Sequence, residues 1–233
     1  APADKPSTPA EPQAPADNPK PTREPLDPKK DPYSAENYVR PQRPGLKVGQ
    51  SAPDLTLLDY DDTEIPLSSI YAKRPLVLVF VKGGWCSVCS STMRGWQARL
   101  GELDKLGASI IMICPQKQQH INDTIDAFKL EYPIFCDRDG RISRAFKVQN
   151  IIDQATAVKF LNHNKIDLSQ LSAEGTWNIP CHATFIIDTD GVIKYAKAFW
   201  PASVNASPED VVNSLRQLER EGKVQRPESP PPA

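Results

Sequence analysis

Cys86 and Cys89 are separated by two residues, and this Cys-x-x-Cys pair is the part of the sequence with the clearest chemical consequence. Two thiols at this spacing around a first helical turn can close into a disulfide. A thiolate there is the nucleophile in disulfide exchange and in attack on peroxides. A structural zinc site would need a second pair at similar spacing, whereas Cys114, Cys136 and Cys181 occur singly. The pair therefore predicts a redox-active dithiol rather than a metal site or two inert, buried cysteines.

A transition from strand to helix is expected to position the pair. Residues 76–81 form a continuous aliphatic run of the length expected for a strand buried on both faces. Residues 83–84 are both glycine, which lets the chain turn tightly after that strand. From Ser90 to about Leu106, apolar residues recur every three or four positions, which predicts one helix. The thiols would then lie at or beside a helix N-terminus, where unpaired N–H groups and the helix dipole favour a thiolate.

Composition divides the chain into one domain and two tails. The chain has 233 residues and a formal net charge of −1, which gives no indication of nucleic acid or an anionic membrane as a partner. Twelve of the 24 prolines lie in residues 1–45, and four more lie in the last seven residues. We expect disordered, Pro-rich tails at 1–45 and 223–233, because neither segment has enough apolar residues to offset the entropy of ordering. Residues 46–222 have the size of one domain, and no apolar run is long enough to span a membrane.

The first residues bear on location. An Ala-Pro-rich start without methionine resembles what remains after removal of a signal peptide, or a tether that holds a domain away from a surface. We therefore expect an extracytoplasmic (periplasmic or secreted) protein, although a clipped Met-Ala start in a cytoplasmic protein would look the same. The cysteines do not decide the matter, because a Cys-x-x-Cys pair serves redox chemistry in either compartment.

Strands and helices alternate along the domain, and a hairpin closes the series. The run ATFIID, a turn at residues 189–191 and an apolar segment that ends at Ala198 predict an antiparallel hairpin. Ser207 is expected to cap a last helix that has Pro208 at its first position. The pattern predicts an α/β fold with a mixed central sheet flanked by helices. The other expected elements are strands at about 55–58, 109–114 and 133–136, helices at about 119–130 and 142–146, a helical insertion with loops at 149–178, and a final helix that ends near residue 221.

Three stretches carry a resemblance to a known family. They are VGQSAPDLTLLD at the start of the domain, VFVKGGWCSVCSSTMRGWQ around the cysteine pair, and KIDLSQLSAEGTWNIPCHATFIIDTDGVIKYA through the hairpin. Together they resemble the thioredoxin fold and, within it, the peroxiredoxin-like group of the alkyl hydroperoxide reductase/thiol-specific antioxidant (AhpC/TSA) superfamily. The likeness covers about residues 47–220 and implies a thioredoxin-like fold and a thiol-dependent, antioxidant oxidoreductase.

Carried over by position, the resemblance assigns roles to both thiols. Cys89 falls at the position of the peroxidatic cysteine of peroxiredoxins. Cys86 falls on that family's threonine, which is also where thioredoxins keep their attacking cysteine. Two residues depart from the patterns: Lys82 replaces a peroxiredoxin proline, and His182 replaces the cis-proline that faces the thiols in thioredoxin-like proteins. A histidine there would stack against or hydrogen-bond the thiols and favour a thiolate, so Cys86, Cys89 and His182 are the candidate catalytic residues.

The other singled-out residues have less specific roles. Cys181 is adjacent to His182 and is expected either near the thiol pair, as a resolving cysteine or third ligand, or in the core. Cys114 lies at the end of an expected strand, on the side of the sheet where parallel α/β folds build their sites, but it is expected to be a core residue. Cys136 is expected to be buried. Trp85 is expected either to shield the thiols from water or to act as a plain core residue.

Several functions remain open at this point. In a peroxidase, Cys89 would attack the peroxide and Cys86 would resolve the sulfenic acid. In a protein disulfide reductase or isomerase, Cys86 would attack and Cys89 would resolve. The alternative is a metal-binding, copper-chaperone-like protein in which both thiolates and His182 hold Cu(I) or Zn, and a third reading is a non-catalytic module that binds a partner through its tails. No nucleotide, flavin or haem motif is present, so no cofactor is expected, and electrons would come from a thioredoxin-like protein or a small thiol. The resemblance also implies that two copies can pair as a homodimer.

Overall fold

The structure is a computed structural model that describes residues 44–173, 179–199 and 206–225. The segments expected to be disordered, 1–45 and 223–233, lie largely outside these residues. The residues of these segments that the structure describes, 44–45 and 223–225, pack on the domain. The Gly45 N–H donates to the Lys147 carbonyl (2.9 Å), and Val224 is buried in the core. Within the described part of the chain, no helix is both long enough and apolar enough to cross a membrane.

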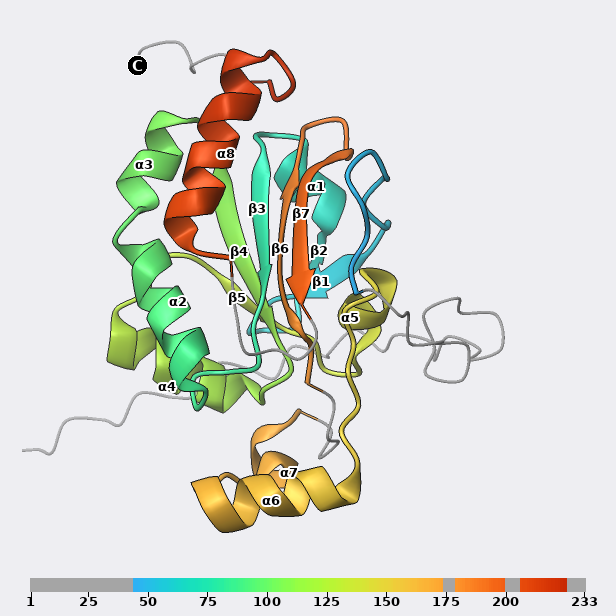
Figure 1. Ribbon diagram of the computed structural model, residues 1–233, viewed down its shortest axis with the longest axis vertical. Coiled ribbons are helices and arrows are strands. Elements are labelled where there is room, and N and C mark those ends of the chain that lie inside the picture. Colours follow the sequence, from blue (N-terminus) through green and yellow to red (C-terminus); the bar gives the residue numbers. More distant parts are fainter. Residues whose placement is uncertain (1–43, 174–178, 200–205, 226–233) are drawn as a thin grey trace, which may run out of the picture.

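A five-stranded mixed sheet forms the centre of the domain (Figure 1). Its strands are β3 (Leu76–Phe80), β4 (Ser109–Cys114), β5 (Ile134–Cys136), β6 (His182–Ile187) and β7 (Ile193–Phe199). The spatial order is β5-β4-β3-β6-β7; β3, β4 and β5 run parallel, and β6 pairs antiparallel with both β3 and β7. All residues of β3 are buried, as expected for an aliphatic strand covered on both faces. The predicted mixed sheet and closing hairpin are therefore confirmed.

Helices cover both faces of the sheet, because alternate residues of each strand point to opposite sides. Val77 and Val79 of β3 pack in one core cluster, whereas Leu76, Leu78 and Phe80 pack in the other. The first cluster is covered by α2 (Ser87–Gln97), α3 (Leu100–Lys105), α4 (Gln118–Phe128) and α8 (Pro208–Arg220). The second is covered by α1 (Leu67–Tyr71), α5 (Arg141–Ala145) and the small antiparallel pair β1 (Thr56–Leu58) and β2 (Glu64–Pro66).

The prediction of one continuous helix from Ser90 to Leu106 is wrong, because the structure has two helices there, α2 and α3. The break lies at Arg99, whose φ and ψ of −116° and 7° leave the helical region. In this conformation the Arg99 guanidinium pairs with Glu102 (2.8 Å) and Glu209 (3.2 Å). Leu103 still reaches the core, so the apolar spacing continues through the break and conceals it in the sequence.

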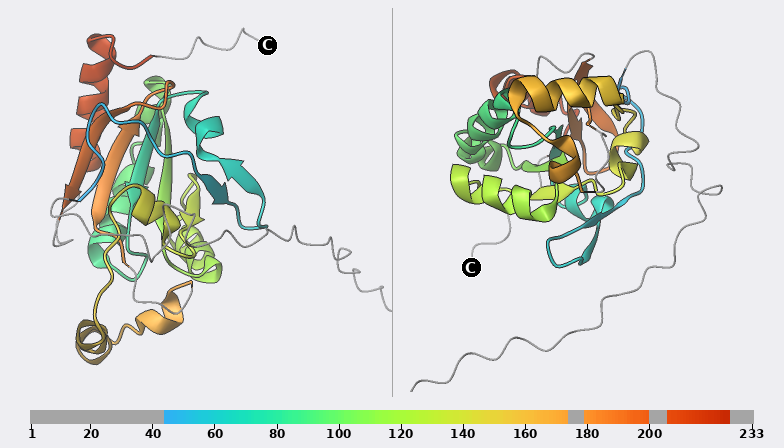
Figure 2. Two further views of the ribbon diagram at one scale, coloured as in Figure 1. Left: turned by 90° about the vertical axis from the view of Figure 1, so that its right-hand side faces the viewer. Right: turned by 90° about the horizontal axis from the view of Figure 1, so that it is seen from below.

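The expected helical insertion is confirmed for its described residues. It contains α6 (Gln154–Asn164) and α7 (Leu168–Leu171), while residues 174–178 lie outside the described part. Asp153 and Asp167 cap these helices by accepting backbone N–H groups of the first turn. The insertion lies beyond the end of the sheet at which β3, β4 and β5 finish (Figures 1 and 2). It has a small apolar cluster of its own, against which Trp85 packs.

The cap of α8 provides a test of the fold. The Ser207 hydroxyl accepts the N–H of Asp210 (3.1 Å), and Pro208 begins the helix, as predicted. We expect Ser207→Ala to lower the free energy of unfolding by about 1 kcal/mol, measured by urea denaturation. Ser214→Ala is the matched control, because its hydroxyl only donates to the Asp210 carbonyl within the same helix. Equal losses in both variants would show that the cap is not responsible.

Candidate active site

The two thiols lie at the first turn of α2. Cys86 is the residue that precedes the helix, in an extended conformation, and Cys89 lies within the first turn. No side chain caps this helix, so its first N–H groups are oriented toward the thiols and favour negative charge there. Cys86 is half-buried, whereas Cys89 has no exposed surface. Both cysteines are free thiols in this structure.

The glycine turn before the pair is held by a residue that the sequence did not single out. Gly83 has a φ of +140°, and a Cβ atom there would lie 2.4 Å from the side chain of Gln116. The Gly84 N–H donates to Gln116 Oε1 (2.8 Å). Gln116 is 4% exposed. In the sequence, only its position two residues after β4, at the end of the sheet that carries the site, indicated that it could belong to the site. The two glycines therefore allow the Gln116 side chain to approach the backbone closely, in addition to allowing the turn itself.

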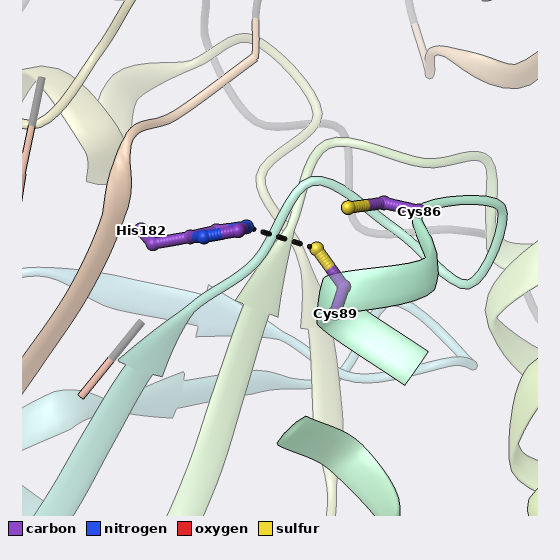
Figure 3. A group of neighbouring side chains, drawn as sticks. All are labelled: Cys86, Cys89 and His182. Carbon is purple, nitrogen blue, oxygen red and sulfur yellow. Dashed lines mark hydrogen bonds between the residues drawn. The ribbon is translucent and has the colours of Figure 1, made fainter. Parts of the chain in front are cut away.

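His182 meets the thiols from the neighbouring strand. It is the first residue of β6, which pairs with β3, and its Nε2 lies 3.1 Å from the Sγ of Cys89 (Figure 3). The Cys89 sulfur also accepts the backbone N–H of Lys82 (3.4 Å). Among the described residues, His182 Nδ1 is buried without a hydrogen-bond partner, which is costly by about 1–3 kcal/mol. The structure therefore brings Cys86, Cys89 and His182 together, as predicted.

The surroundings separate the pKa values of the two thiols. The hydrogen bond from Cys89 lowers the pKa of Cys86 to about 4, assisted by a hydrogen bond from His182 and by the positive charge of Lys82, against the opposing effect of partial burial. Burial raises the pKa of Cys89, and the negative charge on Cys86 raises it further. These opposite directions favour the charged form of the half-buried Cys86 and the neutral thiol of the buried Cys89. This difference favours attack by Cys86, the order of attack expected for thiol–disulfide exchange.

The remaining singled-out residues lie outside this group. Cys181 is fully buried in the core cluster on the opposite face of the sheet from Cys89, so it serves packing. Cys114 is buried, as expected. The prediction that Cys136 is buried is wrong, because Cys136 is half-buried: its strand has only three residues and ends at the sheet edge. Trp85 packs edge-to-face on Phe160 of the insertion, with ring centroids 5.8 Å apart.

Solved structures of peroxiredoxins share this fold. The peroxidoxin BcpB from Mycobacterium tuberculosis superposes with a TM-score of 0.59 at 19% identity, covering 74% of this chain and 98% of that protein. Reduced Prx3 from Vibrio vulnificus, in complex with H2O2, superposes with a TM-score of 0.58 at 18% identity, covering 73% and 99% of the two chains. These similarities confirm the thioredoxin-like architecture.

Sequence comparison identifies the family. A protein described as a putative peroxiredoxin bcp from Helicobacter pylori strain J99 is 26% identical over 170 residues, which cover 73% of this chain and 98% of that protein. The model of the AhpC/TSA family matches residues 48–196, a stretch that includes both thiols and His182. The predicted resemblance and the assignment as a thiol-dependent enzyme are therefore confirmed, and the chain belongs to the AhpC/TSA family.

Proposed function

We propose that this protein is a thiol-dependent peroxidase in which Cys86 attacks the peroxide and Cys89 resolves the product. The contrast between the two thiols carries this proposal: Cys86 is half-buried with a lowered pKa, and Cys89 is buried with a raised pKa. Peroxide reduction needs an accessible thiolate, and only Cys86 of the pair meets both conditions. The peroxiredoxins among its relatives support peroxide as the substrate.

The proposed reaction has two steps. In the first, the Cys86 thiolate attacks the terminal oxygen of the peroxide, the O–O bond breaks, and the leaving alkoxide or hydroxide takes up from solvent the proton that Cys86 released on ionisation. Cys86 becomes a sulfenic acid. In the second, the Cys89 sulfur attacks the Cys86 sulfur, the S–O bond breaks, and the departing hydroxide combines with the proton of Cys89 to give water. The products are an alcohol or water, a second water and a Cys86–Cys89 disulfide.

His182 has a defined part in both steps. Its Nε2–H lies at hydrogen-bond distance from Cys89 and also donates to Cys86, whose pKa it lowers. This donor stabilises the attacking thiolate in the first step. In the second step it stabilises the negative charge that develops on the Cys89 sulfur as its proton leaves. The reductant that restores the dithiol would attack the more accessible sulfur, Cys86, and a thioredoxin-like protein or a small thiol has the required chemistry.

This assignment exchanges the roles that the family positions imply. At Cys89, the peroxidatic position, the side chain has no exposed surface, and the threonine and proline of peroxiredoxins are replaced by Cys86 and Lys82. The cysteine in place of the threonine, Cys86, becomes the nucleophile, and the thiol at the peroxidatic position, Cys89, donates a hydrogen bond to it. We infer that the additional cysteine moves the attack one helical turn outward, to the residue before the helix.

Single-turnover oxidation by hydrogen peroxide tests the proposal. The reduced, metal-free protein is mixed with peroxide, and the products of wild type, Cys86→Ser and Cys89→Ser are analysed by mass spectrometry with a sulfenic-acid trap. We expect a Cys86–Cys89 disulfide in wild type, a trapped sulfenic acid on Cys86 in Cys89→Ser, and reaction no faster than a free thiol in Cys86→Ser. Rapid formation of sulfenic acid on Cys89 in Cys86→Ser would restore the family assignment. If wild type itself reacts no faster than a free thiol, the activity is disulfide exchange.

Metal binding is a second candidate, favoured by one observation. The ligand atoms of Cys86, Cys89 and His182 all lie within 4.8 Å of one another, and two sulfurs with one imidazole suit Cu(I) or Zn. Both sulfurs must be deprotonated to bind, which burial of Cys89 opposes. Stoichiometric metal in the purified protein, lost in His182→Ala, would support this function. Metal-free protein with full peroxidase activity would exclude it as the main role.

A further inference from the structure

A second pair of cysteines lies at the same edge of the sheet. Cys114 ends β4 and Cys136 ends β5, and the two are directly paired in the parallel register. The strands lie side by side in Figure 1. Cα atoms of paired residues on neighbouring strands are about 5 Å apart, within the range of about 4.4–6.8 Å that a disulfide spans. Both side chains pack on the core cluster beneath α2 and α4, so both sulfurs are on one face of the sheet.

Both sulfurs also contact Gln116. The backbone N–H of Gln116 donates to Cys114 Sγ (3.4 Å), and Cys136 Sγ donates to the Gln116 carbonyl (3.0 Å). Two thiols that reach the same residue from adjacent strands are held close together. The pair also repeats the asymmetry of the active site, because Cys136 is half-buried whereas Cys114 is buried.

We propose that Cys114 and Cys136 form a second redox site, a dithiol that small disulfides such as oxidised glutathione convert into an intramolecular disulfide. The accessible Cys136 thiolate attacks one sulfur of glutathione disulfide, the S–S bond breaks, and one glutathione leaves as a thiolate. The Cys114 sulfur then attacks the Cys136 sulfur and displaces the second glutathione. Two electrons pass from the protein to glutathione disulfide, and the two protons of the cysteines are taken up by the two released glutathione thiolates. This chemistry does not depend on the peroxidase activity of Cys86.

The second pair is connected to the active-site turn through Gln116. The Gln116 amide oxygen accepts the N–H of Gly84 (2.8 Å) and lies 3.7 Å from Cys114 Sγ. Oxidation removes both S–H donors that hold Gln116 and draws the two sulfurs together. Gln116 is then held by fewer contacts, which would weaken its hydrogen bond to the turn that precedes Cys86. The redox state of the second pair would in this way alter the mobility of the active-site turn.

Non-reducing peptide mapping tests the second site directly. The full-length Cys86→Ser/Cys89→Ser variant, which keeps Cys114, Cys136 and Cys181, is incubated with oxidised glutathione, quenched with acid, alkylated in denaturant and digested. We expect a peptide pair linked through Cys114 and Cys136 that lacks two hydrogen atoms, with Cys181 still alkylated as the internal control. Wild type treated in the same way should carry this link as well as Cys86–Cys89. Glutathione that remains on Cys136 without a link, or a link that forms only in denaturant, would overturn the proposal.

Amide hydrogen exchange tests the connection to the turn. In the same double variant, we expect the Gly84 N–H to exchange several-fold faster after oxidation than before it. Adding Cys136→Ser removes the link, while its hydroxyl can still donate to the Gln116 carbonyl, so the exchange rate should then no longer respond to glutathione disulfide. Adding Cys181→Ser, on the opposite face of the sheet, should preserve the response. Equal Gly84 exchange in the linked and reduced forms would overturn the connection to the turn.

Discussion

Cys86 in the reduced protein is expected to react with iodoacetamide at a rate that is constant above about pH 6 and falls with a midpoint near pH 4. The hydrogen bond from Cys89 and the other effects at the site lower the pKa of Cys86 to about 4, so the thiolate persists far below the range of an ordinary thiol. At pH 5, we expect Cys86 to react at least about tenfold faster than a free thiol. The gain in thiolate fraction is several thousandfold, but the lower basicity of the sulfur offsets about a hundredfold of it.

Mass spectrometry of the alkylated peptides between pH 3 and pH 9 measures this profile. Cys136 is the comparison within the same molecule, because it is also half-buried but lies at the end of a strand rather than at the start of a helix. A Cys86 profile with its midpoint near the ordinary cysteine value of 9.0 would contradict the assignment of Cys86 as the thiolate. The reverse order, with Cys89 alkylated first in the native protein, would contradict both its burial and its raised pKa.

Replacing His182 with alanine is expected to slow the reaction of Cys86 with peroxide at pH 5 about tenfold. The imidazole supplies a charge-assisted hydrogen bond to the thiol pair, and such bonds contribute about 1.5–3 kcal/mol. Its loss raises the pKa of Cys86, so the alkylation profile should shift to higher pH in parallel with the loss of rate. His182→Gln, which keeps an N–H donor, should recover part of both effects.

Thr184→Val is the matched control for His182. Thr184 lies two residues further along β6 on the same face, and its buried hydroxyl has no hydrogen-bond partner among the described residues. Removing that hydroxyl should leave the pH profile of Cys86 unchanged and should not destabilise the fold. A His182→Ala variant with an unshifted profile but lower stability would mean that the histidine only fills space.

The same pKa values predict how stability responds to pH. The pKa of Cys86 is lower in the folded state than the ordinary value of 9.0, so the unfolded chain binds more protons between pH 4 and pH 9. The thiolate therefore stabilises the reduced protein fully above about pH 9, and this stabilisation decreases as pH falls toward 4. The raised pKa of Cys89 has its effect only above pH 9. The difference in the free energy of unfolding between reduced wild type and Cys86→Ser, measured by urea unfolding across this pH range, should follow this dependence.

The sequence predicted much of this structure because the strands that position the site carry continuous aliphatic runs. Residues 109–114 were expected as a strand and form β4, and the Cys-x-x-Cys pair lies at the start of α2 as expected. His182 was identified by its register opposite the thiols, and the structure confirms the contact. The strand and the start of the helix depend on local patterns, which periodicity and motif spacing record, whereas His182 was identified through the family resemblance.

Features that depend on three-dimensional contact were not visible in the sequence. The break between α2 and α3 follows from the backbone conformation of Arg99, and no proline or glycine marks that residue. The role of Gln116 follows from the packing of its side chain on Gly83 and Gly84, more than thirty residues earlier. The proposal of Cys86 rather than Cys89 as the attacking thiolate rests on burial and hydrogen-bond geometry, because the spacing of the two residues is the same in either role.

The stabilised thiolate at the start of α2 also bears on the driving force of the catalytic cycle. An environment that favours the Cys86 thiolate favours the dithiol form of the enzyme over its disulfide, since the disulfide carries no charge to stabilise. A thiolate stabilised in this way would raise the reduction potential of the Cys86–Cys89 couple and make the oxidised enzyme a better acceptor of electrons. Mildly reducing thiols would then suffice to regenerate it, and the choice of physiological donor would be governed by access to Cys86 rather than by the donor's reducing power.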